Sequence, residues 1–134
     1  MKVTFDQKTI QTINLFHNLT GSNVVDCVNE EDCMYFVVAE GQYGLAVGKN
    51  GAKVKNAERV FKKAIKVFEY ASNVGDFVRN LIPETENIEI KDRLIFARVK
   101  PQDRARVIGK AGKNVKIINK FLQRLFDIEE LKVK

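Results

Sequence analysis

The sequence predicts an α+β fold with two similar small domains, each a three-stranded sheet packed with helices. A phrase of the form Gly-x-x-Gly occurs twice, with its first glycine at Gly48 and again 61 positions later at Gly109. The Val-Lys pair at 54–55 recurs in the same register at 115–116. A repeat of this length in a chain of 134 residues indicates two copies of one domain. The expected domains are residues 1–72 and 73–134.

The first copy is expected to begin with a helix and a β-hairpin. Thr4-Phe5-Asp6-Gln7 has the form of a capping box, and apolar residues recur at helical spacing from Ile10 to Leu19. Two stretches rich in β-branched or aromatic residues follow at 23–28 and 33–38. The polar run between these stretches predicts an acidic turn that joins two strands.

Helices are predicted on both sides of each glycine phrase. In the first copy a short helix covers 43–47, a longer one covers 52–63 with Val54, Ala57 and Phe61 along one side, and a strand covers 67–70. In the second copy, Pro83 ends one helix and Pro101 suits the first turn of another. The elements expected there are helices at 76–81 and 101–108, strands at 88–90 and 94–99, a helix with its apolar stripe from 115 to 125, and a strand at 131–133.

Positive charge gathers around the glycine phrases. The formal net charge is +6, yet residues 1–47 hold two basic side chains against six acidic ones. Residues 98–124 hold nine basic side chains against one acidic one. A basic region of this kind favours a polyanionic partner, and we expect the second copy to contribute more of the electrostatic attraction.

A helix, a turn with two glycines and a second helix can bind the backbone of a nucleic acid. Glycine lacks a Cβ, so the main chain can approach a sugar-phosphate strand closely. The first N–H groups of the second helix have no partner within the helix, and the helix dipole points the same way. Lys49 and Lys110 add a charge beside the phosphates. Contacts of this kind position a strand without reading its bases.

Other chemistry fits the chain less well. A P-loop needs four residues between its glycines and a Ser or Thr for magnesium, whereas Asn50 stands in that place. We find no general acid/base set and no carboxylate cluster for a metal, so we expect no enzyme activity and no cofactor. Cys27 and Cys33 lack the spacing of a redox pair or of a zinc site and are expected to be buried thiols. We assign most of the nine phenylalanines to the cores.

The two phrases and the order of elements around them resemble the KH domain in its type II arrangement. In this family the Gly-x-x-Gly loop clamps the backbone of about four nucleotides. The resemblance implies that single-stranded RNA lies in a groove in each domain. One wall of each groove is implied to be the glycine loop of that domain. These loops are Gly48, Lys49, Asn50 and Gly51 in the first domain and Gly109, Lys110, Ala111 and Gly112 in the second. The floor and far side of the grooves are implied to be Val47, Ile108, Val38 and Val99.

Further basic side chains near the loops are candidates for RNA contacts. Lys55 shares a helix face with Arg59 after the first loop, and Lys116 shares the matching face with Lys120 after the second. Each face either contacts RNA or is a solvated surface. Lys113 lies beside the second loop. Arg104 and Arg106 precede that loop, and they either extend the path of the RNA or are ordinary surface charges.

Two such domains with little else also resemble short archaeal transcription termination/antitermination factors. The resemblance implies a non-catalytic factor that binds nascent RNA, with RNA polymerase as a second partner. A ribosome-associated or ribosome-assembly protein that binds ribosomal RNA is the alternative, because the groove would be the same. No signal peptide or membrane span is evident, so we expect a cytoplasmic protein, and a monomer.

Overall fold

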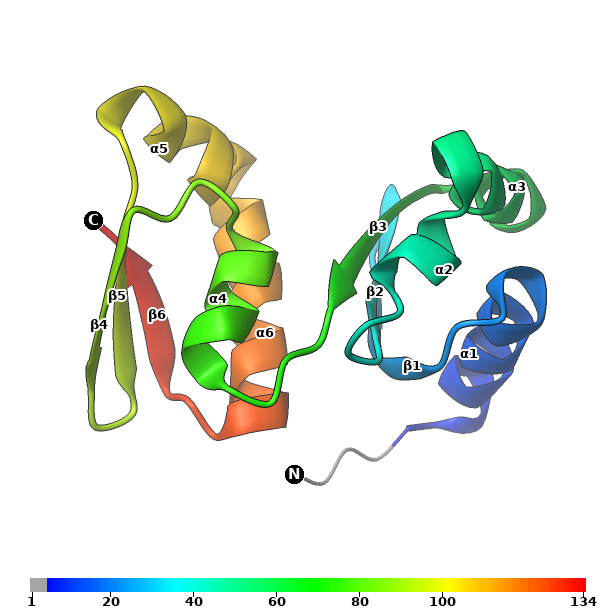
Figure 1. Ribbon diagram of the computed structural model, residues 1–134, viewed down its shortest axis with the longest axis horizontal. Helices are drawn as coiled ribbons and strands as arrows, with labels where there is room; N and C mark the ends of the chain where they lie inside the picture. Colours follow the sequence, from blue (N-terminus) through cyan, green and yellow to red (C-terminus); the bar gives the residue numbers. More distant parts are fainter. Residues whose placement is uncertain (1–4) are drawn as a thin grey trace. The chain divides into compact units, whose positions relative to one another are not determined.

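The computed structural model describes residues 5–134, which form two compact units at residues 5–72 and 73–134 (Figure 1). Each unit has the same order of elements, in which a helix and two strands precede two helices joined by a glycine turn, and a third strand follows. Within residues 5–134, no helix is long and apolar enough to cross a membrane.

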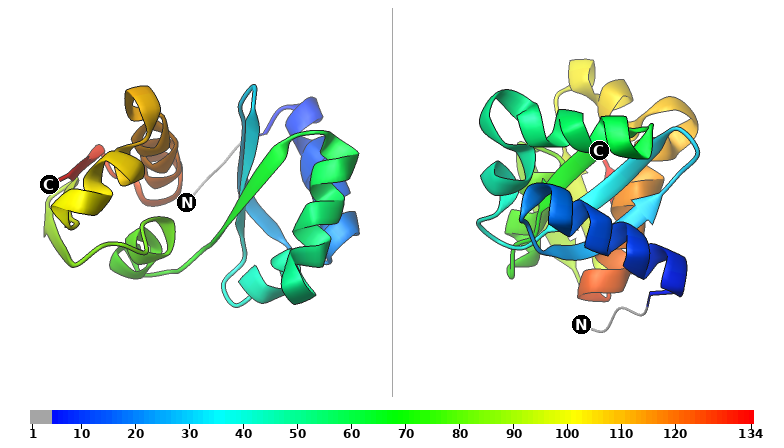
Figure 2. Two further views of the ribbon diagram at one scale, coloured as in Figure 1. Left: turned by 90° about the horizontal axis from the view of Figure 1, so that it is seen from above. Right: turned by 90° about the vertical axis from the view of Figure 1, so that its right-hand side faces the viewer.

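The first unit is a three-stranded sheet with helices on one face. Strand β2 is central, antiparallel to β1 and parallel to β3. Figure 2 shows α1 and α3 side by side on the same face of this sheet. Its elements are α1 (Gln7–Thr20), β1 (Val24–Asn29), β2 (Cys33–Val38), α2 (Tyr43–Val47), η1 (Lys49–Gly51), α3 (Ala52–Phe61) and β3 (Ala64–Glu69).

The core of this unit lies between the sheet and these helices. The rings of Phe16 from α1 and Phe36 from β2 stack with their centroids 3.9 Å apart. Ala46 and Ala57 from α2 and α3 are fully buried in the same cluster, where their small side chains let the helices approach the sheet. Cys27 also lies in this cluster, and Cys33 is likewise a buried thiol, as the sequence predicts.

The second unit repeats the arrangement with a longer final helix. Strand β5 is central, antiparallel to β4 and parallel to β6. Helix α6 contributes five buried apolar side chains to the core. The elements are α4 (Val74–Leu81), β4 (Asn87–Lys91), β5 (Leu94–Arg98), α5 (Pro101–Ile108), η2 (Lys110–Gly112), α6 (Lys113–Phe126) and β6 (Glu130–Val133).

Several predicted boundaries are wrong: for example, the strand expected at 67–70 is Ala64–Glu69, and the helix expected at 76–81 is Val74–Leu81. Two of the differences have a clear local cause. Helix α1 begins at Gln7 because Asp6 is its N-cap and accepts a hydrogen bond from the Thr9 N–H at 2.7 Å. The expected cap, Thr4, lies outside the described residues. Helix α3 ends at Phe61, because Lys62 adopts a left-handed conformation with φ 59° and turns the chain into β3 early.

Candidate nucleic-acid interface

The two glycine turns have the same backbone conformation. The first glycine has φ 78° and ψ 171° at Gly48 and φ 80° and ψ 167° at Gly109. The third residue is left-handed in both turns, with φ 56° at Asn50 and φ 55° at Ala111. The N–H of the last glycine donates to the carbonyl of the first at 3.1 Å in each copy. The sequence repeat is therefore also a repeat of local geometry.

The first glycine is required by the close approach of the next helix. A Cβ added at Gly48 would lie 2.7 Å from Cγ and 2.9 Å from the backbone nitrogen of Lys53. The same atom at Gly109 would lie 2.9 Å from the backbone nitrogen of Asn114. A backbone nitrogen in a helix cannot move aside as a flexible side chain can. The turn is thus held tightly against the start of α3 or α6.

Each turn presents a helix N-terminus without a capping side chain. The N-cap residues of α3 and α6 are Gly51 and Gly112, which carry no side chain to accept hydrogen bonds from the first turn. Lys49 and Lys110 are exposed beside these termini. The combination of N–H groups, the positive end of the helix dipole and a mobile ammonium is suited to a phosphate group.

The residue beneath the first glycine anchors each turn, which the sequence did not reveal. Lys53 extends from α3 and donates to the Thr20 carbonyl at the end of α1 at 3.0 Å. Its counterpart Asn114 donates from Nδ2 to the Arg106 carbonyl at 3.1 Å. The only available signal was position, since both residues come two places after the second glycine. Lys53 is therefore engaged with a carbonyl and is not a mobile cation of the loop.

The helices that precede the turns contact the edge strands β3 and β6. The Tyr43 N–H of α2 donates to Glu69 Oε1 of β3 at 2.9 Å, and Arg104 of α5 donates to the Val133 carbonyl of β6. Val38 and Val99 are 0% and 4% exposed, so their side chains are buried. That these two positions form the far side of a groove stays a prediction, since burial of a side chain does not test it. Val47 and Ile108 are half-buried at the ends of α2 and α5, next to the turns.

In each unit, a polar side chain of the long helix forms hydrogen bonds with main-chain groups at the outer edge of the third strand. Glu58 of α3 accepts a hydrogen bond from the Ile65 N–H at 2.9 Å. In the second unit, Asn119 accepts from the Leu131 N–H at 2.6 Å and donates to its carbonyl at 3.3 Å. Two residues further along β3, the main chain of Val67 points to the same edge, because alternate residues of a strand do so.

The arginines before the second turn differ in their surroundings. Arg106 forms ion pairs with Glu84 at 3.1 Å and with Asp103 at 2.6 Å, so two carboxylates offset its charge. Arg104 donates from Nη2 to the Val133 carbonyl at 3.4 Å, which brings it from α5 to the outer edge of β6. Lys55, Lys116, Arg59 and Lys120 are exposed on the long helices.

Comparisons with known proteins agree with this architecture. A model of the KH domain matches residues 12–78, half of the chain. The "Probable transcription termination protein NusA" of Methanococcus vannielii is 34% identical over 99% of this chain and 80% of its own length. The protein of the same name from Methanocaldococcus jannaschii is 32% identical over 98% of this chain and 75% of its own length.

A third archaeal protein of this name and a solved structure cover both units. The Halococcus morrhuae protein is 28% identical over 99% of each chain. The structure described as "Crystal structure of APE1850" is 30% identical, with a TM-score of 0.79 over 97% of this chain and 100% of that one. The chain belongs to the KH-domain family and, over nearly its whole length, is similar to short archaeal proteins named as probable NusA.

Proposed function

We propose that this chain is a non-catalytic, single-stranded RNA-binding factor with two type II KH domains, at 1–72 and 73–134, that acts in transcription termination or antitermination. The observation that carries the proposal is the pair of glycine turns with the same backbone conformation, each followed by a helix N-terminus without a capping side chain. The names of the archaeal relatives support the transcriptional part. The half-chain match to the KH domain supports RNA as the ligand.

The phosphates of the RNA bind at the turns. In the first domain these contacts come from Gly48, Lys49, Asn50 and Gly51, and in the second from Gly109, Lys110, Ala111 and Gly112. Lys55, Lys113 and Lys116 add positive charge along the helices that follow. Arg104 contributes at the edge of β6, and Arg106 contributes less because Glu84 and Asp103 already pair with it.

The bases lie between the turn and the outer strand of each sheet. Val47 and Ile108 give apolar surface against which bases rest. On the opposite side the outward main chain of β3, at Val67, supplies a donor and an acceptor for the edge of a base. These backbone groups give modest sequence preference, whereas the phosphate contacts give none.

Two weak sites on one chain act together. When one site is occupied, the other meets the same RNA at a raised effective concentration. An RNA long enough to reach both domains therefore binds more tightly than a four-nucleotide piece. Fluorescence anisotropy with the two lengths tests this, and equal affinities would refute the tandem arrangement.

Carboxylates placed in the turns test the phosphate contacts. Lys49→Asp with Asn50→Asp, or Lys110→Asp with Ala111→Asp, should reduce RNA affinity at least tenfold. The matched control is Lys8→Asp with Gln11→Asp, which makes the same change in charge on the exposed surface of α1. If the control weakens binding equally, the attraction comes from net charge and not from the turns. Circular-dichroism melts verify that each variant folds.

The transcriptional assignment includes RNA polymerase as a second partner. Affinity purification from cells should recover polymerase subunits together with nascent RNA. Recovery of ribosomal particles and ribosomal RNA instead would favour the alternative, a ribosome-associated protein, while leaving the RNA-binding sites in place.

A further inference from the structure

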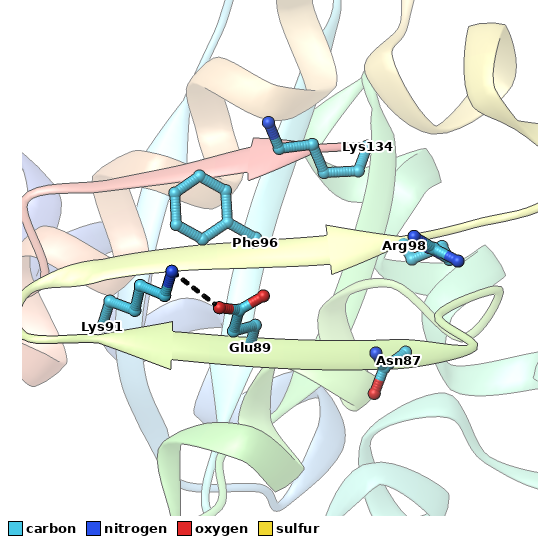
Figure 3. Close-up of a pocket in the computed structure, with 6 residues that line it drawn as sticks. All are labelled: Asn87, Glu89, Lys91, Phe96, Arg98 and Lys134. Atoms are coloured by element: carbon cyan, nitrogen blue, oxygen red, sulfur yellow. Dashed lines mark ion pairs between the residues drawn. The ribbon is translucent and has the colours of Figure 1, made fainter.

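The outer face of the second sheet carries a hollow that the proposed RNA grooves do not use. It has a volume of about 300 Å³ and lies on the strands β4 and β5 and the end of β6. Figure 3 shows the residues that line it: Asn87, Glu89, Lys91, Phe96, Arg98 and Lys134. The fully buried Ile95 points to the other face, toward the core.

An aromatic ring lies at the centre of this face. Phe96 is opposite Glu89 in the strand register and is only half-buried, unlike the phenylalanines that fill the cores, such as Phe16 and Phe36. Its counterpart in the first unit is Tyr35, which is 4% exposed. Phe96 is thus partly exposed, whereas the aromatic residue at the matching position of the first unit is buried.

Positive charge exceeds negative charge around the ring. Glu89 is paired with Lys91 at 3.0 Å, which leaves Arg98 and Lys134 without a carboxylate partner among residues 5–134. The ammonium of Lys134 lies over the ring of Phe96, 5.0 Å from its centroid (Figure 3). A contact between a lysine and an exposed ring is weak, so a flat ligand can displace it.

We propose that this hollow binds one nucleotide of a single-stranded RNA, separately from the glycine turns. The base stacks on Phe96, and the displaced Lys134 ammonium and Arg98 hold the adjoining phosphate. The side-chain amide of Asn87, opposite Arg98 in the register, offers a donor and an acceptor to polar groups of the nucleotide. Stacking on an aromatic ring beside cations tolerates any base, so the site adds affinity with little sequence preference.

The ring decides between RNA and an acidic protein segment as the occupant. An acidic peptide would form ion pairs with Arg98 and Lys134, but it has no flat group that needs to stack on the ring of Phe96. A nucleotide uses both the ring and the cations. The volume of the hollow is at the lower end of the range for small-ligand sites, which suits a single nucleotide.

The test uses the full chain and a 12-nucleotide RNA that contains 4-thiouridine. Photo-crosslinking followed by mass spectrometry should find an adduct on Phe96 or its neighbours in β5. Phe96→Leu, which keeps an apolar side chain but removes the flat ring, should abolish that adduct and weaken RNA binding about fivefold or more. Arg98→Gln should weaken binding and reduce the salt dependence by about one phosphate contact.

The control is Ile90→Val, a small apolar change in the same sheet whose register partner, Ile95, lies on the core face. This variant should bind RNA as the unmodified chain does. Unchanged affinity in Phe96→Leu, with no adduct on β5, would overturn the sheet site while leaving the glycine turns as the RNA site. Displacement of Lys134 by an oligo-glutamate peptide, combined with unchanged RNA affinity in Phe96→Leu, would assign the face to an acidic protein. Failure of the unmodified chain to bind any RNA would refute both proposals.

Discussion

Replacement of the two glycines of one turn by alanine should have unequal effects on stability. Gly48 has φ 78° and ψ 171°, a region open almost only to glycine, where another residue costs of order 1–3 kcal/mol. The added Cβ would also lie 2.9 Å from the backbone nitrogen of Lys53. Gly51 is left-handed, with φ 74° and ψ 16°, and its Cβ would meet only Lys55 Cε at 3.8 Å.

The two costs can be estimated from this geometry. Gly48→Ala should lower the free energy of unfolding by about 3 kcal/mol, since strain and a backbone clash add. Gly51→Ala meets a left-handed penalty of about 1–2 kcal/mol, offset by about 0.4–1 kcal/mol because alanine restricts the unfolded chain. Its net loss should be about 1 kcal/mol.

Urea denaturation followed by circular dichroism measures both variants against the unmodified chain. Because both positions lie in the first unit, the same transition reports both changes. Equal losses, or a larger loss for Gly51→Ala, would refute the idea that the first glycine is fixed by the approach of α3. The second turn supplies a replicate at Gly109 and Gly112, with the same expected order.

Three further predictions concern single side chains. Ala111→Asn, which restores the residue of the first turn at a left-handed position, should stabilise the second unit by about 0.5 kcal/mol in the same urea assay, because Asn tolerates this conformation better than Ala. Asn119→Ala should lower the free energy of unfolding by about 2 kcal/mol, because it leaves both the N–H and the carbonyl of Leu131 without this partner. This loss should exceed that of Glu58→Ala, which removes one hydrogen bond, to the Ile65 N–H. The reverse order in thermal melts would contradict the idea that these helix side chains stabilise the outer strands. Burial raises the pKa of Tyr35 to about 12, so the folded state keeps its proton while the unfolded state loses it near 10. The resulting contribution to stability, roughly 3 kcal/mol, is present below pH 10 and is lost between pH 10 and 12. Absorbance at the tyrosinate band should show a late-titrating component that disappears in Tyr35→Phe. If the unmodified chain lacks this component, the assignment is contradicted.

The glycine turns illustrate what a repeated pattern can predict. Their positions and the helices around them followed from local signals, namely glycine spacing, Pro101 and apolar periodicity. The predicted bounds of α2 and α5 match the structure at both ends. The predicted RNA contacts in the turns stay predictions until the variants are measured.

The residues that surround the turns depended on partners far away in the sequence. Lys53 donates a hydrogen bond to the Thr20 carbonyl, and Arg106 forms an ion pair with Glu84. In the sequence, both look like cations near a glycine turn, as Lys49 does, yet both already have a partner within the protein. A count of basic residues in the sequence does not distinguish such cations from those that are exposed. Only coordinates separate a cation that is held by a carbonyl or a carboxylate from one that is exposed to a ligand.

By itself, the sequence determined that the chain contains two copies of one α+β unit, each with a glycine turn before a long helix. These features depend on residues close together in the sequence, because the backbone freedom of glycine and the spacing of apolar residues in a helix are local properties. The tertiary structure alone decided that β2 and β5 are central, that Val38 and Val99 are buried, and that Phe96 is partly exposed where Tyr35 is buried. Strand order and side-chain burial depend on contacts between distant segments, and short-range patterns in the sequence carry no record of those contacts.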